Sequence, residues 1–162
     1  IERDGRFALR VRDARARTRT AFAGLDYFDT DPSWRIEARF EQHPEGATIE
    51  IANVIGQLSP EPNPGAVVFE REGKTYRIEA LANSDGSLFL IFADRTSGRE
   101  TYGAGRFLDA PAPRDGRVTV DFNLAYSPPC AFNAFSTCPL PPPENRLDLA
   151  VRAGEKKYVA PR

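Results

Sequence analysis

Three polar clusters in the second half of the chain contain the residue types best suited to bind a ligand. The first is the stretch TYGAGR, in which Tyr102 and Arg106 flank two glycines. An arginine offers a planar pair of N–H donors to a carboxylate or a phosphate, and the tyrosine adds a hydroxyl group beside it. The alternative interpretation is that Arg106 pairs with an internal acid such as Asp94 or Asp121.

The other two clusters are VDFN and PPPEN. In the first, Asp121 and Asn123 lie two residues apart, so a strand would place them on one face. The carboxylate there could act as a general base or hold a cation, or the pair could instead tie down the following loop through backbone N–H groups. In the second cluster, a run of three prolines favours an extended segment that presents Glu144 and Asn145 rigidly.

Two cysteines, Cys130 and Cys138, lie in the proline-rich stretch between these clusters. They could form a disulfide in an oxidising compartment or remain buried free thiols. A reactive or metal-binding role is a third reading, although no Cys-x-x-Cys is present and His43 is the only histidine.

The residue inventory excludes several familiar sites. Gly103 and Gly105 would leave a strip free of side chains, where a ligand or another backbone could approach. They do not form a dinucleotide fingerprint, because the third glycine and the following amphipathic helix are missing. A single histidine excludes a multi-histidine metal site, and neither a Gly-x-Ser-x-Gly elbow nor a phosphate-binding loop is present. We therefore expect no metal and no cofactor.

The elements that must position these clusters are predicted to be strands. From Trp34 onward, apolar residues alternate with polar ones, as in WRIEARFE and RVTVDF. The stretch GSLFLIFAD is apolar almost throughout, which is typical of a central strand covered on both faces. Glu72 and Gly73 lie between two strand-like runs and predict a hairpin. The pattern predicts a mainly β fold, an antiparallel β-sandwich or squashed barrel.

The chain is long enough for one domain, residues 1–162. We expect a short helix within an N-terminal segment, residues 1–25, where Phe7, Val11 and Ala14 have helical spacing. A β body follows over residues 34–162, with a proline-rich loop over residues 127–145.

Charge and hydropathy limit the expected partners. The net charge of −1 gives no electrostatic case for nucleic acid, and no apolar run is long enough for a membrane span. We therefore expect a soluble protein. The sequence starts at Ile1 and leaves open a cytoplasmic location or export after loss of a leader. It carries no signal for an oligomeric state.

The motifs together resemble a family of bacterial and archaeal proteins of unknown function, DUF1684. The resemblance rests on FADRTSGRETYGAGRFLDAP, VDFNLAYSPPCAF and CPLPPPENRLDLAVRAGEK, and on AFAGLDYFDTDPSWRIEARF near the start. Ala104 and Ser127 differ from the residues usual there. The resemblance implies a shared fold over most of the chain, and it implies no catalytic residue.

From these observations we expect a binding module. A small polar or anionic ligand would lie in a cleft formed by the three motifs. The first alternative is a hydrolase or lyase with Asp121 or Glu144 as acid or base, and the second is a structural or interaction domain in which the motifs are internal packing. The expected cleft is lined by Tyr102, Arg106, Asp121, Asn123, Glu144 and Asn145.

Overall fold

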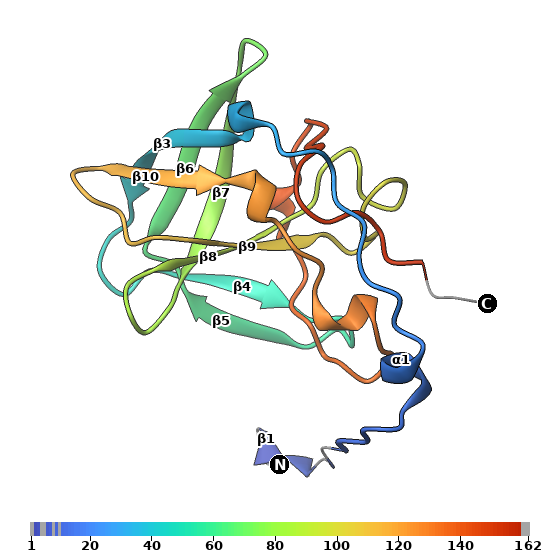
Figure 1. Cartoon of the computed structure of the whole chain (residues 1–162). Coiled ribbons are helices and arrows are strands. Elements are labelled where there is room, and N and C mark those ends of the chain that lie inside the picture. The colour runs from blue at the N-terminus through green and yellow to red at the C-terminus, as the bar shows by residue number, and fades with distance from the viewer. Residues whose placement is uncertain (1, 4–5, 8, 10, 160–162) are drawn as a thin grey trace.

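Six antiparallel strands form a nearly closed barrel in the computed structural model, which describes residues 2–3, 6–7, 9 and 11–159 (Figure 1). Along the barrel sheet the order is β10-β3-β6-β7-β8-β9, and each strand is antiparallel to its neighbours. The barrel strands are β3 (Arg35–Gln42), β6 (Gly65–Arg71), β7 (Lys74–Ala82), β8 (Leu88–Phe92), β9 (Arg106–Ala110) and β10 (Arg117–Asp121). The mainly β fold predicted from the sequence is confirmed, and it takes the barrel form.

Alternation along the strands fills the barrel with apolar side chains. Ala38 of β3, Val67 of β6 and Ile78 of β7 point inward and are fully buried. Strand β8 is covered on both faces, since Leu90 belongs to this inner core and Ile91 to a second core outside the sheet. The apolar run GSLFLIFAD therefore has the two covered faces that its composition predicts, although the strand lies second from one edge of the sheet and not at its centre.

The predicted hairpin between β6 and β7 is confirmed. Arg71 pairs with Lys74, which leaves Glu72 and Gly73 as a two-residue turn. Both turn residues have positive φ, 51° and 73°, as a type I′ turn requires.

A second, two-stranded sheet packs outside the barrel. It consists of β4 (Thr48–Ala52) and β5 (Leu58–Pro62). Ile51 of β4 is buried against Ile91, Phe107 and Cys138. The proline-rich loop binds this sheet at the end of β4, where the N–H of Leu140 donates to the carbonyl oxygen of Ala52 at 2.7 Å.

The C-terminal segment (residues 147–155) completes the inner core. Leu147, Leu149 and Val151 alternate as in a strand and are buried, as the sequence predicts. The segment nevertheless joins no strand of the barrel, so its carbonyl groups need other donors.

Four short 3₁₀ turns lie in the connections between these elements: η1 (Pro32–Trp34), η2 (Phe122–Leu124), η3 (Pro129–Ala131) and η4 (Pro143–Asn145).

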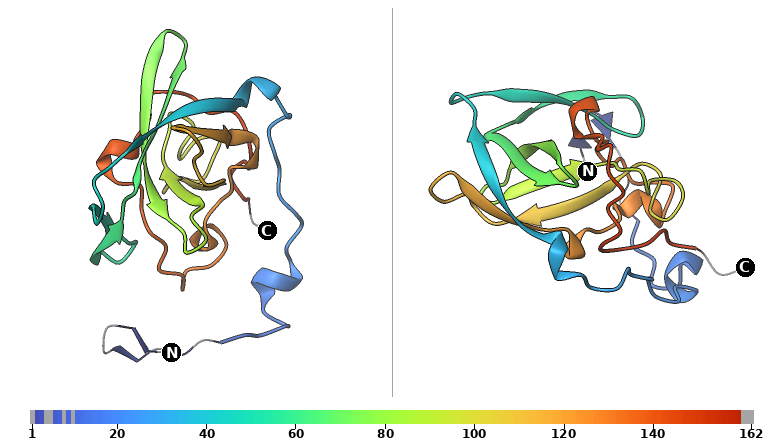
Figure 2. Two further views of the ribbon diagram at one scale, coloured as in Figure 1. Left: turned by 90° about the vertical axis from the view of Figure 1, so that its left-hand side faces the viewer. Right: turned by 90° about the horizontal axis from the view of Figure 1, so that it is seen from above.

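The N-terminal segment differs from the predicted helix. Its only helix in the described residues is α1 (Arg17–Thr20), preceded by the two-residue strands β1 (Glu2–Arg3) and β2 (Arg6–Phe7). Part of the predicted helix, at residues 4–5, 8 and 10, lies outside the described residues. Phe7 and Val11 are 86% and 80% exposed, so the helical spacing finds no surface to pack against. From α1 to η1 the chain runs along the outside of the barrel (Figure 2).

Strand β10 also ends earlier than the alternation predicts. After Asp121 the chain turns into η2, which keeps Phe122 buried but leaves Leu124 65% exposed. In the described part of the chain, no helix is long and apolar enough to cross a membrane.

Gly105 occupies a place where the fold cannot accept a side chain. Its φ is +95°, and a Cβ atom there would lie 2.6 Å from the carbonyl oxygen of Phe92 and 2.6 Å from Cγ of Pro141. The close approach of another backbone, expected from the glycines of TYGAGR, therefore occurs at this glycine.

We expect Gly105→Ala to lower the free energy of unfolding by roughly 3 kcal/mol, the sum of backbone strain and steric overlap. Gly116→Ala is the matched control, because Gly116 has φ +71° and open space around its Cα. Urea denaturation of both variants measures the difference. If both variants lose the same free energy of unfolding, the close packing at Gly105 adds nothing to the effect of the substitution and the prediction is wrong.

Candidate functional site

Arg106, the arginine of the first motif, is completely buried inside one end of the barrel. Its guanidinium donates to the Asp94 carboxylate at 2.8 Å and to the carbonyl oxygen of Val151, also at 2.8 Å. A further short hydrogen bond reaches the carbonyl oxygen of Ala153. Burial lowers the pKa of Arg106, and the neighbouring carboxylate of Asp94 opposes that shift. The arginine thus uses its donors on internal partners and holds the C-terminal segment to the barrel.

The partner carboxylate is held by its own loop. Oδ1 of Asp94 accepts from the backbone N–H and the hydroxyl of Thr96, while Oδ2 accepts from Arg106. The Thr96 hydroxyl lies 2.8 Å from the hydroxyl of Thr101, which directly precedes the TYGAGR turn. Asp94, Thr96, Thr101 and the two terminal nitrogens of Arg106 therefore have protein partners, whereas Nε of Arg106 has none among the described residues.

Asn145 of the third motif is inserted between two barrel strands. Its side-chain amide donates to the carbonyl oxygens of Glu79 and Ile91, both at 2.9 Å, and its Oδ1 accepts from the N–H of Glu79 at 2.7 Å. The pairing of β7 with β8 covers Ala80–Ala82 and stops short of Glu79. The amide side chain therefore takes the place of a strand neighbour.

Asp121 and Asn123 are brought together, at the end of β10. Oδ1 of Asp121 accepts from both the backbone N–H and the side-chain amide of Asn123, at 3.1 and 2.8 Å. The Asn123 side chain also exchanges two hydrogen bonds of 3.0 Å with the backbone of Asp31. This pair starts the η2 turn and attaches the N-terminal segment to the barrel.

The two remaining predicted residues lie apart from this pair. Glu144 is exposed in η4, and no ion pair joins it to Arg106 among the described residues. Tyr102 donates from its hydroxyl to the carbonyl oxygen of Cys130 at 3.3 Å. Burial and the neighbouring cysteines raise the pKa of Tyr102 to about 12, so the phenol remains protonated at neutral pH.

Both cysteines are free thiols in this structure. Cys138 is buried in the outer core, and the backbone N–H of Cys130 donates to its Sγ at 3.2 Å. Among the described residues, no group of three or more His, Cys, Asp or Glu side chains is arranged to hold a metal ion.

A hollow of about 360 Å³ opens beside the end of β3, between the turn that leads into β4 and the residues that follow β5. Its walls are held in place by the backbone. The N–H of His43 donates to the carbonyl oxygen of Pro64 and that of Asn63 to the carbonyl oxygen of Ala47, both at 2.9 Å. The hollow is lined by Gln42, His43, Pro44, Glu45, Gly46, Ala47, Pro62, Asn63, Pro64 and Ala82.

A buried carboxylate stands behind this hollow. Oε2 of Glu79 lies 2.8 Å from Nε2 of His43 and accepts from the Asn63 amide at 2.9 Å, while its Oε1 accepts from Arg77 at 2.8 Å. The side chain of Glu79 is only 10% exposed, compared with 27% for His43. Burial acts to raise the pKa of Glu79, but the hydrogen bonds from Asn63, His43 and Arg77 outweigh it and lower the pKa.

The ionised Glu79 fixes the tautomer of His43. A carboxylate is only an acceptor, so Nε2 must carry the proton, and Nδ1 of the neutral ring then has a free lone pair. Among the described residues, Nδ1 makes no hydrogen bond. His43, which lines the hollow, therefore keeps one hydrogen-bond acceptor without a partner in the described part of the chain.

The sequence alone does not indicate the group of His43, Asn63 and Glu79, because its members lie far apart along the chain. His43 is in a turn after β3, Asn63 follows β5, and Glu79 is within β7. The available signal was the carboxylate of Glu79 in the otherwise apolar end of the strand KTYRIEALA. A charge at such a position needs partners, and one of them is the only histidine of the chain.

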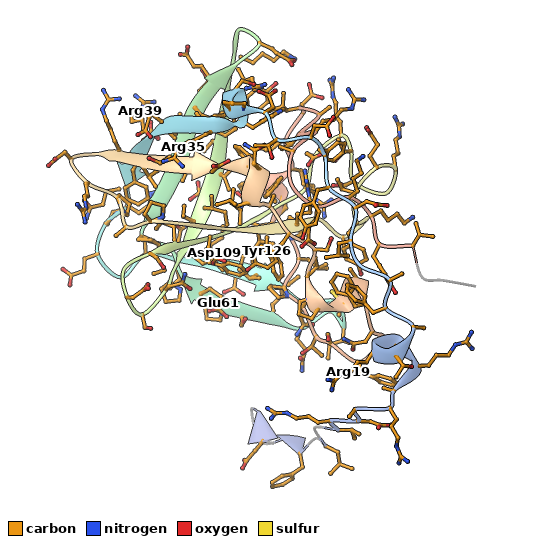
Figure 3. The ribbon with its side chains drawn as sticks, in the orientation of Figure 1. Arg19, Arg35, Arg39, Glu61, Asp109 and Tyr126 are labelled. Atoms are coloured by element: carbon orange, nitrogen blue, oxygen red, sulfur yellow. The ribbon has the colours of Figure 1, made fainter. Side chains whose placement is uncertain are left out.

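Two arginines of β3 carry charges that face solvent. Figure 3 shows Arg35 and Arg39 projecting outward from β3. Their ion pairs with Asp121 and Glu41 are on the surface, with the arginine side chains 63% and 65% exposed. Such pairs contribute little to stability and mark no enclosed site.

Arg106→Ala should lower the free energy of unfolding by about 3–5 kcal/mol, because it leaves the Asp94 carboxylate buried without its counter-ion. Arg152→Ala serves as the control, since Arg152 is 63% exposed and pairs with Glu100 on the surface. The control should lose less than about 1 kcal/mol. Chemical denaturation measures both values, and an Arg106→Ala loss as small as the control's would contradict the structural role.

The lowered pKa of Glu79 predicts a pH dependence of stability. Because the carboxyl has a lower pKa folded than unfolded, its contribution is fully present above the unfolded value, about 4.3, and is lost as pH falls through the folded value. The stability gap between the wild type and Glu79→Gln should therefore narrow as the pH falls from neutral through the unfolded value of about 4.3 toward the lower folded value. A gap that stays constant in urea denaturation over this range would contradict the assignment.

Comparison with known proteins gives this fold a family. The family described as "Protein of unknown function (DUF1684)" matches residues 20–156. A solution NMR structure of an uncharacterised protein from Haloarcula marismortui is 34% identical, with a TM-score of 0.69 over 85% of this chain and 78% of the other. No curated protein matches the sequence significantly. The resemblance seen in the sequence motifs is therefore confirmed, and the chain belongs to the DUF1684 family.

Proposed function

We propose that this domain binds a small polar molecule in the hollow bordered by His43 and Asn63. The observation that carries the proposal is the buried Glu79 carboxylate, which orients the ring of His43 at 2.8 Å beside a hollow of about 360 Å³. Ligand sites commonly combine a preformed hollow with a few well-placed polar groups. Here the wall around residues 42–47 and 62–64 forms the hollow, and the hydrogen-bonded network of His43, Asn63 and Glu79 supplies the polar groups.

The sequence also predicts a small polar ligand, but in a cleft formed by the three motifs. We place the ligand instead in the hollow at His43 and Asn63. The two buried polar side chains of the motifs are engaged elsewhere: Arg106 with Asp94 and three backbone carbonyl oxygens, and Asn145 with the β7 and β8 backbones. The terminal nitrogens of Arg106 and the amide of Asn145 are therefore already used within the fold. His43, by contrast, has one ring nitrogen without a protein partner in the described part of the chain.

The charges around the hollow favour one class of ligand. Glu45 lines it, and the Glu79 carboxylate lies directly behind His43. An anion would meet these carboxylates, whereas a hydroxyl or an amine can donate to Nδ1 of His43 and to a glutamate. We therefore infer a neutral or cationic ligand that carries hydroxyl or amino groups, such as a polyol or an amino sugar.

A second candidate function is acid–base catalysis at the same place. An imidazole held in one tautomer by a buried carboxylate is the arrangement that lets histidine act as a general base. This differs from the alternative expected from the sequence, which used Asp121 or Glu144. Turnover would require the bound molecule to have a proton that His43 can remove.

The test is an NMR titration of the wild type and of His43→Ala with a panel of polyols, amino sugars and small amines. A ligand should shift the amide signals of residues 42–43 and 45–47 and of Asn63. His43→Ala should weaken binding about tenfold, the value of one lost hydrogen bond. Arg114→Ala is the matched control, since Arg114 lines a separate hollow on the β10 side of the barrel.

The outcomes separate the two candidate functions. New ligand signals that accumulate with the wild type and not with His43→Ala would favour the enzyme, and unchanged ligand signals would favour the binding module. Shifts confined to amides far from the hollow, or full affinity in His43→Ala, would contradict both.

A further inference from the structure

Cys130 and Cys138 lie together although seven residues separate them. The backbone N–H of Cys130 donates to Sγ of Cys138 at 3.2 Å. Cys130 is half-buried in the η3 turn, while Cys138 is 6% exposed and packs on Ile51, Ile91 and Phe107. Sγ of Cys138 therefore already contacts the backbone of Cys130 and hydrogen-bonds with its side chain.

Both ends of this cysteine loop are anchored to different parts of the fold. At Cys130, the carbonyl oxygen accepts from the hydroxyl of Tyr102, which belongs to the TYGAGR turn. At Cys138, the carbonyl oxygen accepts from the N–H of Val54 at 3.1 Å, and the neighbouring Pro139 forms a β-bridge with Asn53. A covalent bond between the two sulfurs would therefore connect the barrel end to the β4–β5 sheet.

We propose that Cys130 and Cys138 form a reversible disulfide, and that small-molecule disulfides are the reagents that oxidise it. The loop has the features of a redox-responsive site rather than a permanent crosslink. The two thiols are adjacent in the reduced fold, one is accessible to a reagent and the other is shielded in the apolar core.

The chemistry proceeds in two exchange steps. The Cys130 thiol loses its proton, and the thiolate attacks one sulfur of the reagent disulfide, which releases one reagent thiolate and leaves a mixed disulfide. Cys138 then loses its proton and attacks the Cys130 sulfur, which releases the second reagent thiolate. In total the protein loses two electrons and two protons, and the reagent gains them as two thiols.

The environment of Cys138 makes it the second partner. Burial and a hydrogen bond with the Cys130 side chain raise the pKa of Cys138 to about 11. A thiol in this state reacts slowly with reagents in bulk solvent. Once Cys130 carries the mixed disulfide, however, the adjacent sulfur is held where exchange within the protein is fast.

The experiment treats the native chain with glutathione disulfide and follows intact mass and thermal melting. We expect loss of two hydrogen atoms, no retained glutathione, and a rise in Tm of roughly 5–10 °C from closure of a short loop. Dithiothreitol should reverse all three changes. The amides of Val54 and Leu140 should exchange with solvent more slowly in the oxidised form.

Cys130→Ser provides the control, because its half-buried position tolerates a small polar residue. The variant should acquire no intramolecular bond and show no rise in Tm. The proposal is overturned if the native wild type keeps stable glutathione adducts, or if the bond forms only after unfolding in urea. A bond that lowers Tm would overturn it as well.

Discussion

The buried pair of Arg106 and Asp94 is the interaction on which the architecture depends. In this barrel β9 and β10 are the edge strands of the sheet, and no strand ladder joins them. One end of the barrel is open and must be covered by apolar side chains. The C-terminal segment covers that end with Leu147, Leu149 and Val151 but lies in no strand ladder. Its carbonyl oxygens therefore require donors from elsewhere. The backbone N–H groups of Arg95 and Phe28 donate to the carbonyl oxygens of Leu149 and Gly154, and the planar guanidinium of Arg106 donates to those of Val151 and Ala153. The charge that this places in the core is balanced by Asp94.

This constraint explains why the most conspicuous polar motifs are poor candidates for a binding surface. The TYGAGR turn places Arg106 and brings Gly105 against the chain at Phe92. Asn145 substitutes for a missing strand neighbour beside Glu79 and Ile91. The same frame also positions the polar wall of the hollow. Asn145 holds the backbone of Glu79, and the side chain of Glu79 in turn holds His43 at the edge of the hollow. The network that supports the barrel and the group at the hollow thus meet at one glutamate.

The strands, the β6–β7 hairpin and the inward-facing residues of the C-terminal segment could be predicted from the sequence, because alternation and turn residues are local signals. The limits of prediction have equally physical origins. The N-terminal spacing of Phe7 and Val11 predicts a helix, but a helix forms stably only where its apolar face can pack. The polar clusters are visible in the sequence, and an internal acid is one of the partners that it allows for Arg106, but the sequence does not show which partner a buried arginine finds. The hollow at His43 was missed because its groups come from three separate elements and meet only through strand pairing.

Native-state hydrogen exchange determines whether the C-terminal segment is an integral part of the barrel, held by Arg106. The amides of Leu147 and Glu155 donate to the carbonyl oxygens of Ala93 and Ala125 at 2.8 Å. If the segment is integral, these amides exchange only through global unfolding, with the same free energy of opening as the amides of β8. If they exchange through a local opening of much lower free energy while β8 stays protected, the segment detaches on its own and the account is wrong.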